Sequence, residues 1–279
     1  MVKSELTIAH IAVIGAGIMG SGIAKVCLAG GFQVRLFDPD PEALRHAESR
    51  ITKNGQAKED LLRLDVTGDL KVALENTDML IEAAPEMIEI KQQIFRRASD
   101  LAPKNAILAT NTSQLSVTDI GSVVERPHNV VGMHWFNPPE RMELVEIVQA
   151  TKTSQVTVSA TEEVVRRCGK TSVVVADRRG FVVTRAVAAS ILEGIRIYEE
   201  GVAQLEDIDT AIKLGLNHPM GPLELADYIG LDTLLLIADS MTSTMGDRFQ
   251  APQVLRALVK ANRLGRKTGR GFYSYDVKN

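Results

Sequence analysis

A histidine and a glutamate, His134 and Glu146, have the side chains and the spacing that acid/base chemistry needs. Each lies in an apolar run, residues 131–136 and 142–148, and a pair of prolines separates the runs. We therefore expect two short buried strands, the second turning back on the first, with the two side chains facing each other. A neutral imidazole accepts a proton near pH 7, and a carboxylate on its second nitrogen fixes the tautomer and stabilises the cation. Spacing alone also fits a core histidine beside a satisfied buried glutamate.

A glycine-rich turn near the amino end is typical of dinucleotide binding. The apolar run 8–14 leads into Gly15-Ala16-Gly17-Ile18-Met19-Gly20, and a helix pattern follows as far as residue 29. The first glycine permits the tight turn, the second lets the backbone approach a pyrophosphate, and the third lets helix and strand pack closely. Asp38 ends the next strand 18 residues after Gly20, where an acid binds ribose hydroxyls and repels a 2′-phosphate. We expect NAD rather than NADP; the alternative is an ordinary glycine turn with Asp38 opening the turn at 38–41.

The elements that must position these residues alternate between strands and helices. Strands are expected at 33–37, 78–84, 106–110 and 171–176, with helices opening at Asp40-Pro41-Glu42 and covering 87–101 and 151–169. Such alternation predicts a doubly wound parallel sheet that binds its ligand at the carboxyl ends of its strands. Ser113, the Glu86 loop and His134 lie at such ends.

The pattern changes near residue 180. One helical stripe covers 184–198, and further helices are expected around 206–214, 223–229, 231–245 and 252–262. A chain of 279 residues has the length of about two domains. The predicted fold class is α/β, with a Rossmann-type doubly wound parallel sheet over residues 1–179 and an all-α domain over 180–279.

Composition argues against several kinds of partner. The formal net charge is -3 and no dense Lys/Arg run occurs, so nucleic acid and membrane are not expected as partners. The first ten residues include Lys3, Glu5 and His10, which predicts neither a signal peptide nor a membrane span. Cys27 and Cys168 are too few for a disulfide framework or a zinc site, so we expect a cytoplasmic protein without a metal.

Several motifs together carry a resemblance to a known family. They are the glycine turn at 15–20, Asn111-Thr112-Ser113, His134-Trp135-Phe136-Asn137-Pro138, Leu144-Val145-Glu146, Gly180-Phe181-Val182-Val183 and Gly269-Arg270-Gly271-Phe272-Tyr273. In these motifs the chain resembles the L-3-hydroxyacyl-CoA dehydrogenases, including the bacterial 3-hydroxybutyryl-CoA dehydrogenases, over nearly its whole length. The resemblance implies reversible hydride transfer between NAD and the C3 carbon of an acyl-CoA substrate, in a homodimer joined through the helical domain.

The resemblance also implies a role for particular residues. It makes His134 the general base and Glu146 its orienting carboxylate, with Ser113 and Asn137 near the reacting oxygen. One histidine beside the nicotinamide can take the hydroxyl proton in oxidation and return it in reduction. The structural alternatives are a turn hydroxyl for Ser113 and a turn amide for Asn137. The implied cofactor contacts are Gly15, Gly17, Ile18, Met19, Gly20, Asp38, Glu86, Lys91, Asn111 and Lys267.

Two departures from the family pattern leave alternatives open. Thr184 stands where the family has an asparagine that helps hold the substrate oxygen. Its hydroxyl either reaches that oxygen through a water or a small shift, or bonds the carbonyl of Gly180. The region 54–69 is shorter than the segment with which the family touches CoA, and Lys53 and Lys58 are expected to be solvated surface lysines rather than phosphate ligands.

These departures motivate two competing functions. The short segment fits a related dehydrogenase of a free hydroxy acid or sugar acid. Thr184 fits an NAD-binding protein with little turnover. The intact set His134, Glu146, Ser113 and Asn137 argues against an abandoned site.

Overall fold

The chain folds into two compact units. The computed structural model describes residues 6–53 and 58–276, and the first unit ends at Phe181 while the second begins at Val182. The sequence places the boundary near residue 180. The expected fading of the helix at Asn54-Gly55 lies outside the described residues.

The first unit is built on an eight-stranded sheet in the order β3-β2-β1-β4-β5-β6-β7-β8. Strands β1 to β6 run parallel, β7 is antiparallel to β6, and β8 is parallel to β7. The Rossmann-type fold is thus confirmed as a mostly parallel sheet, and the second apolar run does turn back on the first. The strands are β1 (His10–Ile14), β2 (Gln33–Phe37), β3 (Leu64–Thr67), β4 (Met79–Glu82), β5 (Ile107–Thr110), β6 (Val130–Trp135), β7 (Leu144–Gln149) and β8 (Thr171–Ala176).

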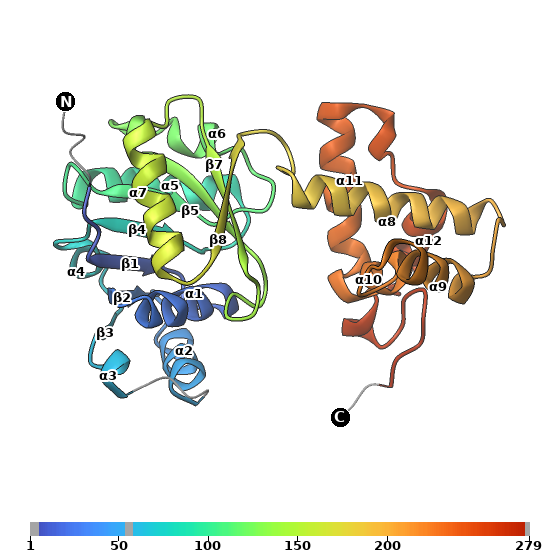
Figure 1. Cartoon of the computed structure of the whole chain (residues 1–279), viewed down its shortest axis with the longest axis horizontal. Coiled ribbons are helices and arrows are strands. Elements are labelled where there is room, and N and C mark those ends of the chain that lie inside the picture. Colours follow the sequence, from blue (N-terminus) through green and yellow to red (C-terminus); the bar gives the residue numbers. More distant parts are fainter. Residues whose placement is uncertain (1–5, 54–57, 277–279) are drawn as a thin grey trace. The chain divides into compact units, whose positions relative to one another are not determined.

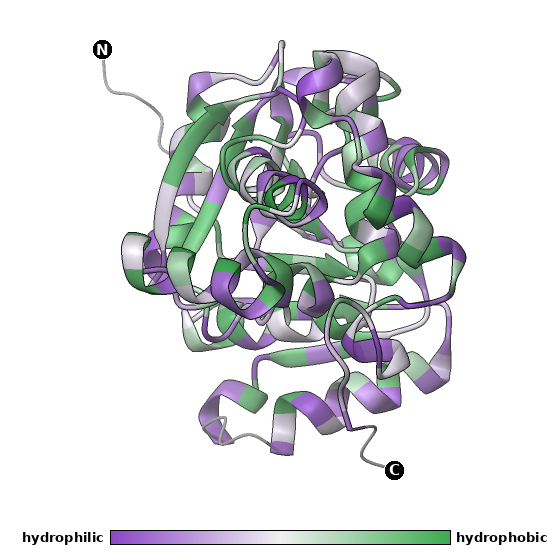
Figure 2. Ribbon diagram, turned by 90° about the vertical axis from the view of Figure 1, so that its right-hand side faces the viewer, coloured by the Kyte–Doolittle hydropathy of each residue, from purple (hydrophilic) through white to green (hydrophobic). Residues whose placement is uncertain are grey.

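Helices cover both faces of this sheet (Figure 1). On one face lie α1 (Ile18–Ala29), α2 (Pro41–Lys53) and α7 (Gln155–Arg167), and on the other lie α4 (Leu70–Leu74), α5 (Ile88–Leu101) and α6 (Val117–Gly121). The short α3 (Lys58–Leu61) and η1 (Pro127–Asn129) complete the unit. Because the central strands are buried on both sides, they are nearly continuous apolar runs, whereas the helices are banded in polar and apolar residues (Figure 2).

Local hydrogen bonds set where the helices begin. The Asp40 carboxylate accepts the amide of Glu42 at 2.9 Å, which fixes the start of α2 where the sequence predicts it. Helix α7 begins at Gln155 rather than at 151, because Ser154 caps it and the Thr153 hydroxyl is bonded to the carbonyl of Val130 at 2.6 Å. Strand β3, which is short and only half-buried, was not predicted from the sequence.

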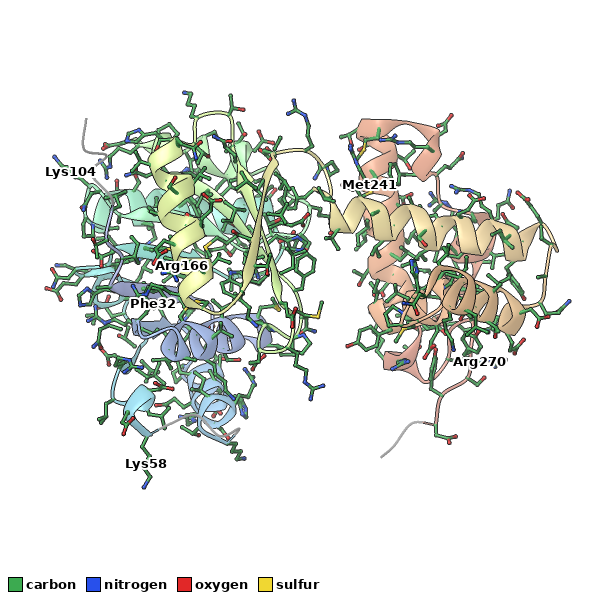
Figure 3. The ribbon with its side chains drawn as sticks, viewed as in Figure 1. Phe32, Lys58, Lys104, Arg166, Met241 and Arg270 are labelled. Atoms are coloured by element: carbon green, nitrogen blue, oxygen red, sulfur yellow. The ribbon has the colours of Figure 1, made fainter. Side chains whose placement is uncertain are left out.

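The second unit is helical, as expected. It contains α8 (Val183–Glu199), α9 (Leu205–Leu216), α10 (Pro222–Ile229), α11 (Leu231–Met245) and α12 (Gln253–Lys260), with η2 (Asp247–Phe249) and η3 (Arg266–Thr268). Its core includes Ile191, Leu234 and Met241, the last labelled in Figure 3. None of the helices within the described ranges is long and apolar enough to cross a membrane.

Two buried aspartates fasten the end of the chain to this bundle. Asp227 on α10 accepts the amides of Phe272 and Tyr273, each at 2.9 Å, and Asp209 on α9 accepts the Tyr273 hydroxyl at 2.8 Å. A Cβ on Gly271 would lie 1.9 Å from an Asp227 oxygen, so the tail can approach only with glycine at that position. The motif at 269–273 therefore has a structural explanation within the second unit.

Candidate active site

His134 and Glu146 form a buried hydrogen-bonded pair. They are directly opposite each other on the antiparallel strands β6 and β7, so their side chains leave the same face of the sheet. The distance from Nδ1 of His134 to Oε2 of Glu146 is 2.7 Å, and the two side chains are only 4% and 1% exposed. The sequence predicted that these residues face each other, and the strand register explains why they do.

The surroundings of His134 fix the orientation of its ring. The ring centroid lies 4.3 Å from that of Phe136 and 5.6 Å from that of Phe181. A carboxylate on Nδ1 requires that nitrogen to carry the proton, which leaves the lone pair of the neutral ring on Nε2. Among the described residues, none is hydrogen-bonded to Nε2. The pair can therefore exchange a proton with a group brought to Nε2. A role for Phe181 beside the His134 ring was not predicted from the sequence.

The glycine turn has the shape that a dinucleotide needs. Gly15 has a φ of 106°, and a Cβ on Gly20 would lie 1.7 Å from the Gly15 carbonyl oxygen, so both positions require glycine. A Cβ on Gly17 would meet nothing within 4 Å, and α1 begins there without a side-chain cap. Open space before uncapped helix amides fits a phosphate group.

Asp38 braces this turn from β2. One carboxylate oxygen accepts the amide of Ala16 at 2.8 Å, and the other accepts the amide of Asp40 at 2.9 Å. Each oxygen has a second lone pair, so the carboxylate can also accept ribose hydroxyls. The side chain is half-buried at the end of its strand, where the sequence places it.

A chain of contacts links the glycine turn to β6, the strand of His134, at the carboxyl ends of the parallel strands. A Cβ on Gly15 would lie 2.8 Å from the Ala83 carbonyl oxygen, just after β4. The Asn111 amide donates to the Glu82 carbonyl at 2.7 Å, and the Asn111 side-chain oxygen accepts the Trp135 amide at 3.1 Å. Glycine turn, Asn111 and His134 thus lie along the same carboxyl-end edge.

Ser113 is exposed on the loop after β5, and Glu86 holds that loop. Oε1 of Glu86 accepts the Thr112 hydroxyl at 2.6 Å and the Ser113 amide at 2.9 Å. The Ser113 hydroxyl is therefore presented by backbone that is tied to a neighbouring loop. Asn137 is exposed in the loop after β6, and its peptide bond to Pro138 is cis.

Lys91 is completely buried beneath these loops. Its Nζ lies 2.8 Å from Oε1 of Glu82, which is also completely buried, and 3.6 Å from Oε2 of Glu86. Burial raises the pKa of Glu82, and the Lys91 charge opposes that rise. Glu82 was not among the residues predicted from the sequence to belong to the site. A carboxylate within a buried apolar strand needs a cation, and that requirement was the available signal.

Thr184 and Lys267 belong to the second unit. Thr184 is half-buried in the first turn of α8, and the hydrogen bonds of the described residues do not include one from its hydroxyl to the Gly180 carbonyl. Lys267 donates to Asp232 at 2.6 Å, a bond that helps to lower the pKa of Asp232 against the effect of burial. Lys53 and Lys58 are exposed, and Lys58 extends away from its unit in Figure 3.

Comparison with known proteins decides the family. The sequence model of the 3-hydroxyacyl-CoA dehydrogenase NAD binding domain matches residues 10–178, and that of the C-terminal domain of the same dehydrogenases matches residues 180–275. The chain belongs to the 3-hydroxyacyl-CoA dehydrogenase family. It is similar to a probable 3-hydroxybutyryl-CoA dehydrogenase of Bacillus subtilis, 41% identical over 98% of this chain and 99% of the relative. The 3-hydroxybutyryl-CoA dehydrogenase of Clostridioides difficile is 40% identical over 95% of this chain and 99% of that protein.

A solved structure agrees with this membership of the 3-hydroxyacyl-CoA dehydrogenases. The (S)-3-hydroxybutyryl-CoA dehydrogenase PaaH1 from Ralstonia eutropha superposes with a TM-score of 0.93 at 35% identity, covering 97% of this chain and 100% of that one. The predicted family, the enzyme class and the cofactor NAD are thereby confirmed. The open space beside Gly17 lies within the range that matches the NAD binding domain.

Proposed function

We propose that the protein interconverts an L-3-hydroxyacyl-CoA and the corresponding 3-ketoacyl-CoA, using NAD and the His134-Glu146 pair. The observation that carries this proposal is the buried 2.7 Å contact between Nδ1 of His134 and Oε2 of Glu146. The pair lies at the carboxyl-end edge of the sheet, where the glycine turn also lies. The dehydrogenases of Bacillus subtilis, Clostridioides difficile and Ralstonia eutropha support an acyl-CoA with a short chain as the substrate.

The proton is handled by His134 in both directions. During oxidation, Nε2 accepts the proton of the C3 hydroxyl while the hydride leaves C3. The Glu146 carboxylate then stabilises the imidazolium through Nδ1. During reduction, the imidazolium donates that proton to the C3 oxygen as the hydride arrives. Bound NAD supplies the hydride acceptor of the oxidation and, as NADH, the donor of the reverse reaction.

The other site residues hold the reacting oxygen and the cofactor in this proposal. Ser113 and Asn137 present a hydroxyl and an amide to the substrate oxygen, with Thr184 in the place of the family's asparagine. The glycine turn and Asp38 hold the dinucleotide, and Glu86, Asn111 and Lys267 complete its surroundings. Exposed apolar side chains on the helical unit, such as Leu214 and Leu236, support a homodimer joined through that unit.

Acetoacetyl-CoA and free acetoacetate, tested side by side with NADH, separate the proposal from its competitors. We expect loss of nicotinamide absorbance with the thioester and little with the free acid. Turnover of the free acid alone would instead show a dehydrogenase of free hydroxy acids. Tight NADH binding without turnover of either compound would show a binding protein.

A further inference from the structure

A buried ion pair lies beneath the loops that carry Glu86 and Ser113. Glu82 is the last residue of β4, and Lys91 is in the first turn of α5. Nζ of Lys91 lies 2.8 Å from Oε1 and 3.0 Å from Oε2 of Glu82, and neither side chain is exposed to solvent. Burying two charges is costly, so such a pair persists only where the remaining bonds of both groups are also satisfied.

The remaining bonds of the pair reach the ends of two neighbouring strands. Glu82 accepts the Thr110 hydroxyl and the Ala84 amide, both at 2.6 Å. Lys91 donates to the Asn111 carbonyl at 3.1 Å and to the Ala84 carbonyl at 3.3 Å. The ammonium and carboxylate therefore join the loop after β4 to the end of β5.

Both of these segments hold groups of the site. The side-chain oxygen of Asn111 accepts a hydrogen bond from the backbone amide of Trp135, the residue after His134. Glu86, whose Oε2 is 3.6 Å from Lys91, holds the Thr112 hydroxyl and the Ser113 amide through Oε1. Lys91 is thus the point where bonds toward His134 and toward Ser113 meet.

We propose that Glu82 is a positioning residue of the reaction, which acts by holding the Lys91 ammonium so that the Ser113 loop and the His134 strand keep one relative placement. The proposal rests on the proposed function, because it takes Ser113 and His134 as the groups that meet the substrate. Lys91 carries the bonds that join the two segments, since its ammonium is enclosed by protein acceptors.

The test replaces the pair by neutral side chains of similar shape. Glu82→Gln alone leaves the buried ammonium with only the more distant Glu86 carboxylate, 3.6 Å away, as a counterion. Lys91→Met alone leaves a buried carboxylate unpaired, so each single variant should lower the thermal midpoint. The double variant buries no unpaired charge, and its thermal midpoint should return toward that of the wild type. It still lacks the donor to Asn111 and the counterion of Glu86.

For the double variant we expect kcat for acetoacetyl-CoA reduction to fall by about 10²-fold with little change in KM, because misplacement by about 1 Å costs that much. Amide hydrogen exchange should become faster at Ser113 and Trp135 and stay unchanged at Val13 in the central strand β1. A double variant with wild-type kcat and wild-type exchange at those amides would overturn the proposal.

A second pair of variants keeps the test decisive if the double variant does not fold. Thr110→Val removes one bond to Glu82 without changing any charge, and it should lower kcat severalfold and speed exchange at Ser113. The matched control is Thr157→Val on α7, where a fully buried hydroxyl donates to the His128 carbonyl at 2.8 Å, away from the site edge. Equal effects of the two substitutions on kcat and on exchange at Ser113 would contradict the proposal. If the wild type does not reduce acetoacetyl-CoA, the proposed function fails, and the exchange rates still decide the positioning role.

Discussion

At the scale of single residues, the site depends on buried polar groups with close partners. His134 is oriented by Glu146 and by two aromatic rings, and the loop of Ser113 is held by Glu86. A polar group buried without a partner would cost stability, so each bond both stabilises the fold and places a functional group. Thr184 differs from His134 and Ser113 in this respect, because its hydroxyl is not held by a hydrogen bond to any described residue.

Thr184→Asn tests whether this position limits the reaction. The asparagine amide extends further than the threonine hydroxyl, and one added hydrogen bond to the reacting oxygen corresponds to about a tenfold gain. We expect kcat/KM for acetoacetyl-CoA to rise by about that factor in steady-state assays. Thr184→Val is the matched control and should lower kcat/KM if the hydroxyl serves the substrate. A fall with asparagine would instead mean that the site is shaped around threonine.

At the scale of elements, the strand-turn-helix unit β1-α1 contains one glycine in close contact with backbone, Gly20, and one beside open space, Gly17. Gly20→Ala places a Cβ 1.7 Å from the Gly15 carbonyl oxygen, which forces backbone apart, whereas Gly17→Ala meets nothing within 4 Å. We expect Gly20→Ala to lower the free energy of unfolding by about 1–3 kcal/mol in urea titrations. Gly17→Ala should leave that free energy unchanged and weaken NADH binding, measured by fluorescence. Equal stability of the two variants would contradict the close contact between Gly20 and the Gly15 carbonyl.

The tail of the second unit should respond to alkaline pH. Burial and the nearby Asp227 carboxylate raise the pKa of Tyr275 to about 12, and burial with Asp209 also raises that of Tyr273. A phenol whose folded pKa is raised stabilises the fold below its unfolded pKa, and this contribution is lost as pH rises through the folded value. In an absorbance titration of the tyrosinate band, two of the four tyrosines should therefore ionise late, with loss of helical signal. Tyr275→Phe should remove one late step; four equal early steps would refute the packing of the tail.

How far the sequence predicts these elements depends on local signals. Strands β1, β4 and β6 are apolar runs, and α11 has bounds that match its periodicity, so burial alone locates them. Strand β3 was missed because its residues are half-buried and include Asp65. The opposition of His134 and Glu146 was predictable from the proline pair. The partners of Lys91 were not predictable, since they come from two segments, the end of β4 with its following loop and the end of β5, which the sheet order brings together.

At the scale of the whole molecule, the chain forms two units with separate hydrophobic cores. The first unit holds the glycine turn and the His134-Glu146 pair around a sheet whose central strands are buried on both faces. The second carries Thr184 on a helical bundle whose surface includes exposed apolar side chains. A contiguous apolar patch is typical of a surface that binds another protein, so the proposed homodimer requires these side chains to lie together on one face.

Light scattering tests the proposed homodimer directly. We expect twice the chain mass of 30.4 kDa at micromolar concentration. Leu236→Glu on α11 should lower that mass toward one chain, because a charge in an apolar interface is costly. The matched control, Leu62→Glu, alters an exposed leucine of the first unit and should leave the mass unchanged. A wild-type mass of a single chain would rule out the dimer.

The central claim is that His134, oriented by Glu146, exchanges the proton while NAD exchanges the hydride. A single-turnover measurement with NADH and acetoacetyl-CoA tests it most directly, comparing the wild type with His134→Gln. We predict hydride transfer slower by about 10²–10⁴-fold in the variant, with the NADH dissociation constant unchanged. A rate within a few-fold of the wild type, at equal NADH binding, would contradict the account.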